Sequence, residues 1–491
     1  MNKCIINSKE SIIFETSQPS DNNRFIFSFT IMNKFLYPIL FSIAVSVNAQ
    51  DQNKAAKFDS LFTKKYNDKT FNGNILIAEK GKIVFQKSFG VADYKTKSLL
   101  NNTTVFELAS VSKPFTAMGI VMLEKQGKLK YDDPISKFIP ELSFYKNITV
   151  RNLLNHTSGL PDYIGLFQKN WDKSKFATNK DIVTEFAKYK PEIHFQPNEK
   201  YEYSNTGYAL LGYIIEKASG KTFGDYLETN VFKPLEMKNT FVYRSRFQPK
   251  TIENYAKGFI ENDFGTIISP DDLGKSYYTY YLDGIVGDGM VNSTTEDLLK
   301  WDRSLYSNKL VNEKDKAIIF QGTKLNNGKM TDYGFGWQIG ENKEYGKVVA
   351  HSGSWAGYTN YIEINLSKDQ TIILLQNIDT FKTEIPAQSV RKILNNEKIT
   401  VVTAKKTVYN DKVLNQFLGV YSAENFPMKV TVTQENKILY AQATGQDKFP
   451  TEAYENNVFA FDLAGIKLIF NPEKNEMILE QGEDKTFFKK E

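Results

Sequence analysis

The chain has 491 residues, more than one domain of ordinary size, so a large domain and a smaller one are expected. Hydrophobic residues make up 41% of it, including 36 Phe and 27 Tyr, which supplies an extensive core and excludes a disordered or fibrous protein. The net charge is +5 with no long block of one sign, so the composition gives no reason to expect a nucleic-acid partner.

The first recognisable segment spans residues 32–49. Met32 and Lys34 precede an apolar run from Phe35 to Val47, and small residues follow as far as Ala49. This pattern predicts that residues 1–49 are an N-terminal extension and signal peptide, and that the mature protein is periplasmic or secreted. A membrane anchor is the alternative. The run is too short to span a bilayer, so no membrane span is expected after signal cleavage.

Helices and strands are mixed in the next 350 residues. Asn74–Ala78 and Lys82–Ser88 are β-rich runs around Gly81 and predict a hairpin, and apolar residues at helical spacing predict a buried helix over Phe115–Glu124. The other expected elements are helices at Ala209–Ser219, Thr295–Leu305 and Glu384–Leu394, and strands at Val348–His351, Tyr358–Asn365 and Thr371–Gln376. This mixture favours an α+β fold with an antiparallel sheet over a doubly wound one.

The pattern changes after a polar stretch that ends at Lys405 and Lys406. Apolar Met428, Val430 and Val432 then alternate with polar residues. Turn residues recur at 434–436, 445–446, 456–457 and 471–472. The chain is therefore expected to hold one domain over residues 50–400 and a small all-β domain, a meander or barrel, over residues 405–491.

Ser110 and Lys113 are the first candidates for chemistry. A serine hydroxyl needs a base within hydrogen-bond reach, and a lysine can serve if its surroundings keep part of its population neutral. Spacing of i, i+3 at a helix entrance, marked by Pro114, places the two on one face. The same spacing recurs at Ser143 and at Ser389, where it is expected to be a solvated face. Only Lys113 is followed by a strongly apolar helix that could desolvate it.

Two later segments could complete a site. Tyr203 and Asn205 lie in a loop ahead of a helix expected to start at Gly207, and a tyrosine can pass a proton to a leaving group. His351 ends a strand and precedes Ser352 and Gly353. Glycine on an edge strand allows close approach of a substrate backbone, and the N–H groups that follow can face a carbonyl oxygen.

These segments carry a resemblance. Ser110-Val111-Ser112-Lys113, Tyr203-Ser204-Asn205 and His351-Ser352-Gly353, in that order, resemble the three signature motifs of the serine β-lactamase and penicillin-binding protein superfamily, nearest its class C-related branch. Flanking segments are also similar: they are Asp132-Asp133-Pro134, 153–161 and 287–298. The resemblance covers residues 55–395 and implies a β-lactamase/transpeptidase-like fold. The all-β domain is similar to the lipocalin-like appendage of some relatives.

The resemblance implies roles for the site residues. Ser110 attacks a carbonyl carbon, Lys113 and Tyr203 share proton transfer, and Asn205 orients Lys113 or the substrate amide. The oxyanion is expected to bind the backbone N–H groups of Ser110 and Ser354. In the third motif, His351, Gly353, Ser354 and Trp355 are expected to bind substrate.

His351 is a departure, because many β-lactamases carry a lysine there that helps to hold the substrate carboxylate. Neutral imidazole offers less fixed positive charge, so ester or D-amino-acid peptide substrates are favoured over β-lactams. The expected partners are a small peptide or ester, cell-wall peptides included.

Other residues have simpler interpretations. His156 is expected to be a loop histidine bonded to backbone, and Tyr277, Tyr278, Tyr280 and Tyr281 either wall a pocket or pack ordinarily. With three histidines and one cysteine, Cys4, no metal site is expected, and no cofactor-binding motif occurs.

Two functions remain at this point. One is a serine hydrolase that forms an acyl-enzyme at an amide or ester. The other is a non-catalytic protein that keeps the fold and binds or senses peptidoglycan peptides or β-lactams. Complete Ser, Lys, Tyr and Asn side chains favour the enzyme.

Overall fold

The computed structural model describes residues 53–262, 264–342, 345–355, 357–380, 382–397, 405–424, 426–444, 448–461, 466–481 and 484–491. The expected extension and signal peptide lie outside these residues. Within the described part, no helix is long and apolar enough to cross a membrane.

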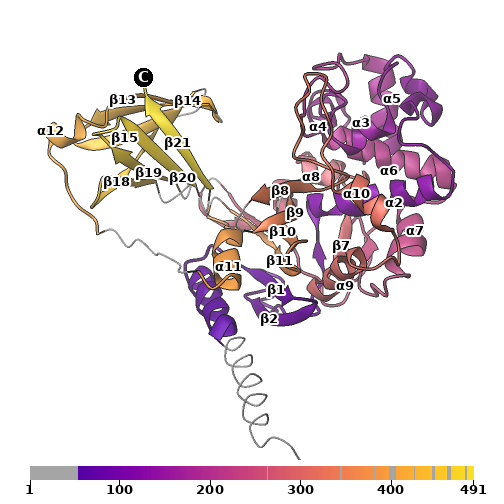
Figure 1. Cartoon of the computed structure of the whole chain (residues 1–491), viewed down its shortest axis with the longest axis horizontal. Coiled ribbons are helices and arrows are strands. Elements are labelled where there is room, and N and C mark those ends of the chain that lie inside the picture. The colour runs from indigo at the N-terminus through magenta and orange to yellow at the C-terminus, as the bar shows by residue number, and fades with distance from the viewer. Residues whose placement is uncertain are drawn as a thin grey trace, which may run out of the picture. The chain divides into compact units, whose positions relative to one another are not determined.

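A six-stranded antiparallel sheet forms the base of the larger domain (Figure 1). The strand order is β2-β1-β11-β10-β9-β8. The strands are β1 (Gly73–Glu79), β2 (Lys82–Phe89), β8 (Gln338–Asn342), β9 (Gly346–Trp355), β10 (Tyr358–Asn365) and β11 (Gln370–Gln376). The predicted hairpin is β1 and β2, and its turn places Lys80 and Gly81 at positive φ of 51° and 74°. The antiparallel α+β prediction is therefore confirmed.

Both faces of this sheet pack against helices, and successive side chains of β1 point alternately to the two faces. Ile75 and Ile77 join Phe58 and Phe62 of the helix over 53–67, together with residues of α11 (Ala387–Leu394). Leu76 and the other alternate residues of β1 face the main core, which includes α2 (Lys113–Lys125) and α9 (Thr295–Leu305). Because side chains alternate along a strand, one strand contributes to two cores.

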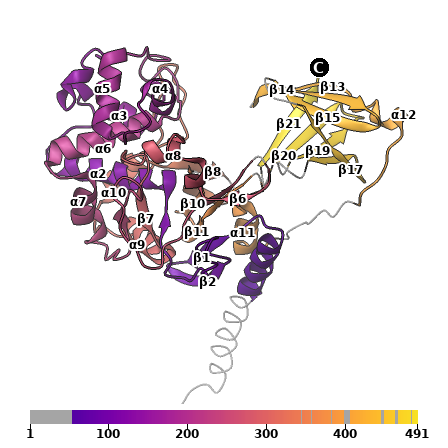
Figure 2. The same cartoon turned by 180° about the vertical axis from the view of Figure 1, so that it is seen from behind.

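Four helices form a second group, away from β1 and β2 in both views (Figures 1 and 2). They are α3 (Val150–Leu154), α4 (Tyr163–Asn170), α5 (Asn179–Tyr189) and α6 (Asn205–Ser219). Helix α6 packs against α2 and joins this group to the sheet side. The shorter elements are β3 (Phe106–Glu107), α7 (Phe223–Leu227), β4 (Phe241–Val242), β5 (Phe259–Glu261), β6 (Ile267–Ile268), α8 (Tyr278–Tyr281), β7 (Val291–Ser293), α10 (Glu313–Ile319) and β12 (Ile378–Asp379).

Most predicted bounds agree with the structure. The predicted helix over Thr295–Leu305 is α9, and the strand over Tyr358–Asn365 is β10. The helix predicted from Glu384 begins only at Ala387, because Pro386 is its N-cap. The strand predicted to end at His351 continues to Trp355, since it pairs with β10 along that whole length.

The C-terminal domain is a nearly closed all-β barrel. Its strand order is β16-β15-β14-β13-β21-β20-β19-β18-β17, and only Thr451 separates β16 from β17 in sequence, so the two ends of the sheet meet. The elements are α12 (Asp411–Leu414), β13 (Gly419–Ala423), β14 (Phe426–Glu435), β15 (Ile438–Ala443), β16 (Phe449–Pro450), β17 (Glu452–Tyr454), β18 (Val458–Phe461), β19 (Ile466–Asn471), β20 (Glu476–Gln481) and β21 (Asp484–Lys490). Phe417, Phe459 and Phe470 pack ring against ring in its core. The turn predicted at 445–446 lies outside the described residues.

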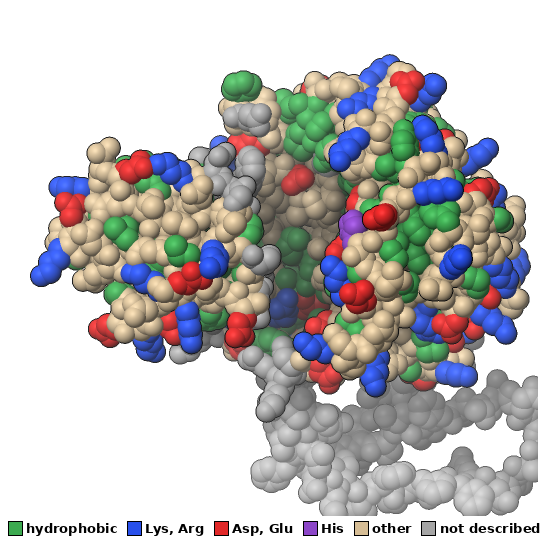
Figure 3. Space-filling view, turned by 90° about the horizontal axis from the view of Figure 1, so that it is seen from above, with side chains coloured by type: hydrophobic (Ala, Val, Ile, Leu, Met, Phe, Trp, Pro, Cys, Tyr) green, Lys and Arg blue, Asp and Glu red, His purple; other side chains and the backbone are tan. Residues whose placement is uncertain are grey.

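Surface charges are dispersed. On the face shown in Figure 3, Lys and Arg side chains are interspersed with Asp and Glu. This distribution agrees with the small net charge of the sequence.

Candidate active site

Ser110 lies in a short 3₁₀ turn, Ala109–Ser112, that runs directly into α2. The prediction placed Ser110 and Lys113 at a helix entrance, and the structure shows that this entrance is a 3₁₀ turn. In a 3₁₀ turn, residues three apart lie one above the other. Oγ of Ser110 is therefore 3.0 Å from Nζ of Lys113. Ala109, just before the nucleophile, has a φ of +49°, a strained value for a residue with a Cβ.

Lys113 is completely buried and has three oxygen neighbours. Besides Ser110, its Nζ donates to Oδ1 of Asn205 at 3.1 Å and to the backbone carbonyl of Asp288 at 2.9 Å. Tyr203 lies over the same group, with its ring centroid 5.0 Å from Nζ. A neutral lysine keeps two N–H bonds, which Asn205 and Asp288 can accept. Its lone pair then faces Ser110, which is the arrangement a general base needs.

Asn205 is fixed by the start of α6. The Ser204 side chain accepts the N–H of Gly207 at 3.2 Å, so the helix begins at Asn205, two residues before the predicted start. The Asn205 amide nitrogen donates to Oδ2 of Asp162 at 3.1 Å. This contact leaves Oδ1 facing Lys113.

His156 supports the Tyr203 loop. Its ring Nδ1 accepts the backbone N–H of Ser204 at 3.1 Å, and its own carbonyl accepts the N–H of Glu202 at 3.0 Å. Its ring lies 4.3 Å from that of Tyr203. Burial, together with the charge of Lys113, lowers the pKa of His156 well below its usual range, so the ring is neutral. The expectation of a backbone-bonded histidine is confirmed.

Gly353 permits a close approach, but by a different partner from the one predicted. A Cβ at this position would lie 2.4 Å from the carbonyl oxygen of Leu108, and 3.1 and 3.0 Å from the nitrogens of Ser110 and Val111. The nucleophile segment, not a substrate, therefore fills the space. β8 pairs with β9 only as far as Ala350, so the edge predicted at Gly353 is present.

His351 is buried beside the cleft. Its Nε2 is 3.0 Å from the hydroxyl of Tyr333, and its Nδ1 is 2.6 Å from the carbonyl of Ser352. Burial and the nearby charge of Lys113 lower the pKa of His351 to about 3. The imidazole is therefore neutral at physiological pH and supplies no fixed positive charge.

A cleft of about 470 Å³ brings the predicted residues together. Ser110, Tyr203, Asn205, His351, Ser354 and Trp355 line it. Lys113 and Gly353 lie behind this lining. Trp355 is half-buried and contacts Tyr278 edge to face at 5.2 Å.

The cleft also contains residues that the sequence analysis did not select. Glu107 and Asp288 are acids in its lining, and no Lys or Arg occurs among the described lining residues. Asp288 accepts a hydrogen bond from Tyr163 at 2.9 Å, and burial raises its pKa against the opposing charge of Lys113. Glu107 is three residues before Ser110, and Asp288 lies in one of the flanking segments. Their positions near the motifs were the only sequence signal that could have identified them as site residues.

The competing candidates lie elsewhere. Ser143 caps a 3₁₀ turn, Pro140–Leu142, and Ser389 is within α11. Of the four tyrosines from 277 to 281, only Tyr278 lines the cleft, whereas Tyr281 is in the main core.

Comparison with known proteins assigns the chain to a family. The model of the family described as Beta-lactamase matches residues 58–393. The chain belongs to the Beta-lactamase family. Penicillin-binding protein 4* of Bacillus subtilis (strain 168) is 40% identical over 402 residues, which cover 80% of this chain and 89% of that protein.

Two solved structures illustrate the range of this family. A penicillin-binding protein from Bacillus halodurans has a TM-score of 0.58 and 26% identity, and covers 68% of this chain and 98% of its own. D-amino acid amidase from Ochrobactrum anthropi SV3, complexed with L-phenylalanine amide, has a TM-score of 0.54 and 25% identity, with coverage of 71% and 97%. The Beta-lactamase fold predicted from the motifs is confirmed.

Proposed function

We propose that this protein is a serine acyl-hydrolase that cleaves an amide or ester through an acyl-enzyme on Ser110. The contact of 3.0 Å between Ser110 and Lys113 carries the proposal, since the other two acceptors of Lys113 are fixed by the fold. Family membership supports it.

The reaction follows from the positions of these groups. When Lys113 is deprotonated, it takes the Ser110 proton as Oγ attacks the carbonyl carbon. The backbone N–H groups of Ser110 and Ser354 are assigned to the oxyanion. Tyr203 passes a proton to the leaving group and regains one from Lys113. Water then gives a proton to Lys113 as it attacks the acyl-enzyme, and Lys113 returns this proton to Ser110 as the acid leaves. His156 acts only by holding Tyr203.

The charges in the cleft favour ester and D-amino-acid amide substrates over β-lactams. A β-lactam carries a carboxylate, whereas His351 is neutral and no Lys or Arg lines the described part of the cleft. The likeness to a D-amino acid amidase supports an amide of a D-amino acid as one substrate class.

A fluorophosphonate probe tests the nucleophile. We expect labelling of the wild type and none of Ser110→Ala. Ser143→Ala is the matched control, because Ser143 has the same spacing to a lysine but lies outside the cleft. Equal labelling of wild type and Ser110→Ala contradicts the proposal. Stable penicillin labelling of Ser110 without turnover of any ester or amide supports the binding-protein alternative instead.

Substrate preference needs a separate assay. Hydrolysis of a nitrocefin-type lactam, a p-nitrophenyl ester and a D-alanyl dipeptide is compared in one preparation. We expect ester turnover to exceed lactam turnover, and the reverse order contradicts the argument from His351. The signal-peptide pattern at 32–49 supports export, which cell fractionation tests.

A further inference from the structure

Glu107 is a buried carboxyl group that the proposed reaction does not use. It lies on β3 and is only 3% exposed, yet it lines the cleft. Its backbone carbonyl accepts the side-chain amide of Asn360 at 2.8 Å. Among the described residues, nothing donates a hydrogen bond to its carboxyl oxygens. Its carboxyl oxygens are not among the fully buried atoms that lack a partner, so they open into the cleft, where a bound group can pair with them.

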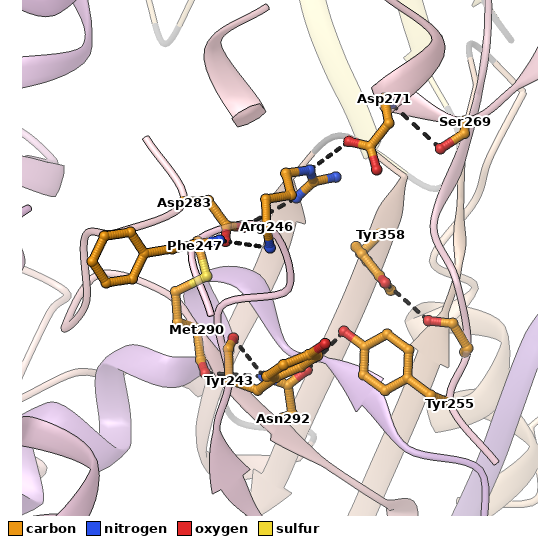
Figure 4. Close-up of polar contacts among 11 residues, drawn as sticks. Tyr243, Arg246, Phe247, Tyr255, Ser269, Asp271, Asp283, Met290, Asn292 and Tyr358 are labelled. Carbon is orange, nitrogen blue, oxygen red and sulfur yellow. Dashed lines mark hydrogen bonds and ion pairs between the residues drawn. The ribbon is translucent and has the colours of Figure 1, made fainter. Parts of the chain in front are cut away.

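The charge of Arg246 opposes the raised pKa of Glu107, but the Arg246 guanidinium pairs with two other acids. Figure 4 shows its guanidinium between Asp271 and Asp283, and it donates to both carboxylates. Asp283 is fully buried and also accepts the backbone N–H groups of Arg246 and Phe247 at 2.8 Å. Two acids therefore already surround one cation. An ionised Glu107 would add a further negative charge, which a bound cation could balance.

Glu107 lies beside the paired strands β9 and β10, since its carbonyl accepts the Asn360 amide and Asn360 is the cross-strand partner of Gly353. Its charge raises the pKa of Tyr255 and Tyr358, whose pKa burial already raises. Tyr358 pairs with Trp355 at the far end of β9. His351, which contacts the ring of Tyr203, is four residues earlier on the same strand, roughly 13 Å away at the usual rise.

This geometry separates the two halves of a substrate. Tyr203, the proposed proton donor, marks the leaving-group end. The acyl part then extends along β9 towards Trp355 and Glu107. Tyr278 and Trp355 provide aromatic walls at that end, and Leu282 is an aliphatic neighbour in the same lining.

We propose that Glu107, Tyr278 and Trp355 form a subsite for a primary ammonium group carried on an aliphatic side chain of the acyl part of the substrate. Aromatic faces and a carboxylate both attract a cation, and aliphatic lining suits the methylene arm. The assignment rests on the proposed acyl-enzyme reaction, because Ser110 defines which part is the acyl group.

Binding to this subsite depends on pH. Burial, together with the charge of Asp283, raises the pKa of Glu107 to about 8 against the opposing charge of Arg246. Without a bound substrate, the Glu107 carboxyl is therefore protonated at neutral pH, and it must lose this proton to pair with an ammonium group. The affinity for a cationic side chain consequently rises as pH increases towards 9, while a primary amine keeps its own proton.

Matched substrates test the proposal. The p-nitrophenyl esters of Nα-acetyl-lysine and Nα-acetyl-norleucine, in both configurations, differ mainly by the ammonium group. We expect kcat/KM for lysine to exceed that for norleucine about tenfold at pH 8.5 in one configuration, with a smaller ratio at pH 6.5. In Glu107→Gln the ratio falls to about one, whereas the exposed control Glu141→Gln keeps the wild-type ratio. A ratio of one in the wild type, or an unchanged ratio in Glu107→Gln, overturns the subsite.

A binding assay separates this proposal from the reaction. Calorimetric titration of Ser110→Ala with Nα-acetyl-lysine amide and Nα-acetyl-norleucine amide needs no turnover. We expect about tenfold tighter binding of the lysine amide, lost when Glu107→Gln is added. Equal binding of the two amides overturns the subsite. Selective binding without turnover of any ester by the wild type retains the subsite and refutes only the hydrolase.

Discussion

Replacing Glu107 with glutamine should change how the stability of the larger domain depends on pH. Burial raises the pKa of Glu107 from an ordinary value of 4.5 to about 8 in the folded state. Between these two values the folded chain keeps the proton and the unfolded chain has lost it. The unfolded state then binds fewer protons, so the free energy of unfolding falls as pH rises.

The size of this effect follows from the same two values. Over about 3.5 pH units, at about 1.4 kcal/mol per unit, Glu107 lowers the free energy of unfolding by about 5 kcal/mol between pH 4.5 and 8. This is an upper limit, because water that enters the cleft reduces the cost of the charge. Glu107→Gln removes this pH-dependent decrease in the free energy of unfolding. A buried amide adds its own cost, but that cost does not vary with pH.

Urea unfolding followed by tryptophan fluorescence measures the free energy of unfolding at each pH. All four tryptophans, Trp171, Trp301, Trp337 and Trp355, are outside residues 405–491, so the signal reports the larger domain alone. The difference in free energy of unfolding between Glu107→Gln and wild type should increase in favour of the variant by several kcal/mol from pH 4.5 to 8. Glu141→Gln should show no such increase. A difference that stays constant across this interval would refute the assignment of Glu107 as a buried, protonated carboxyl.

Three further substitutions test the site. Gly353→Ala should lower kcat at least a hundredfold, because the added Cβ would displace the nucleophile segment. The control Gly165→Ala, which has open space around it, should keep the wild-type kcat. Equal steady-state rates for the two variants would contradict this prediction. His156→Phe leaves the buried N–H of Ser204 without its acceptor, so thermal melting should show a loss of about 1–3 kcal/mol together with a lower kcat, and unchanged values would remove its supporting role. Asn205→Ala should lower kcat about a hundredfold or more with little change in melting temperature, and a kcat within twofold of wild type would exclude Asn205 from the reaction.

The order of the motifs predicted most of the site. Ser110, Lys113, Tyr203, Asn205 and His351 meet at or just behind one cleft although up to 241 positions separate them, and the motif that contains each of them can be read locally. Element bounds shifted where a cap decided them. Ser204 starts α6 early because its side chain accepts a backbone N–H, and Pro386 starts α11 late.

Contacts between distant segments could not be predicted in this way. Gly353 was predicted to allow the approach of a substrate, yet its missing Cβ accommodates the backbone from Leu108 to Val111. Only the packing of β9 against that turn decides this. No sequence pattern marks Glu107, since one acid in a strand has no distinctive surroundings. Its raised pKa depends on its burial and on the pairing of Arg246, 139 residues later, with two other acids.

The sequence alone determined the fold class, the order of the motifs and the pairing of Ser110 with Lys113, because these depend on local periodicity and on spacing within one turn. The tertiary structure alone decided the electrostatic character of the cleft. Whether His351 carries a charge, and whether Glu107 keeps its proton, depends on burial and on charges brought together from remote parts of the chain.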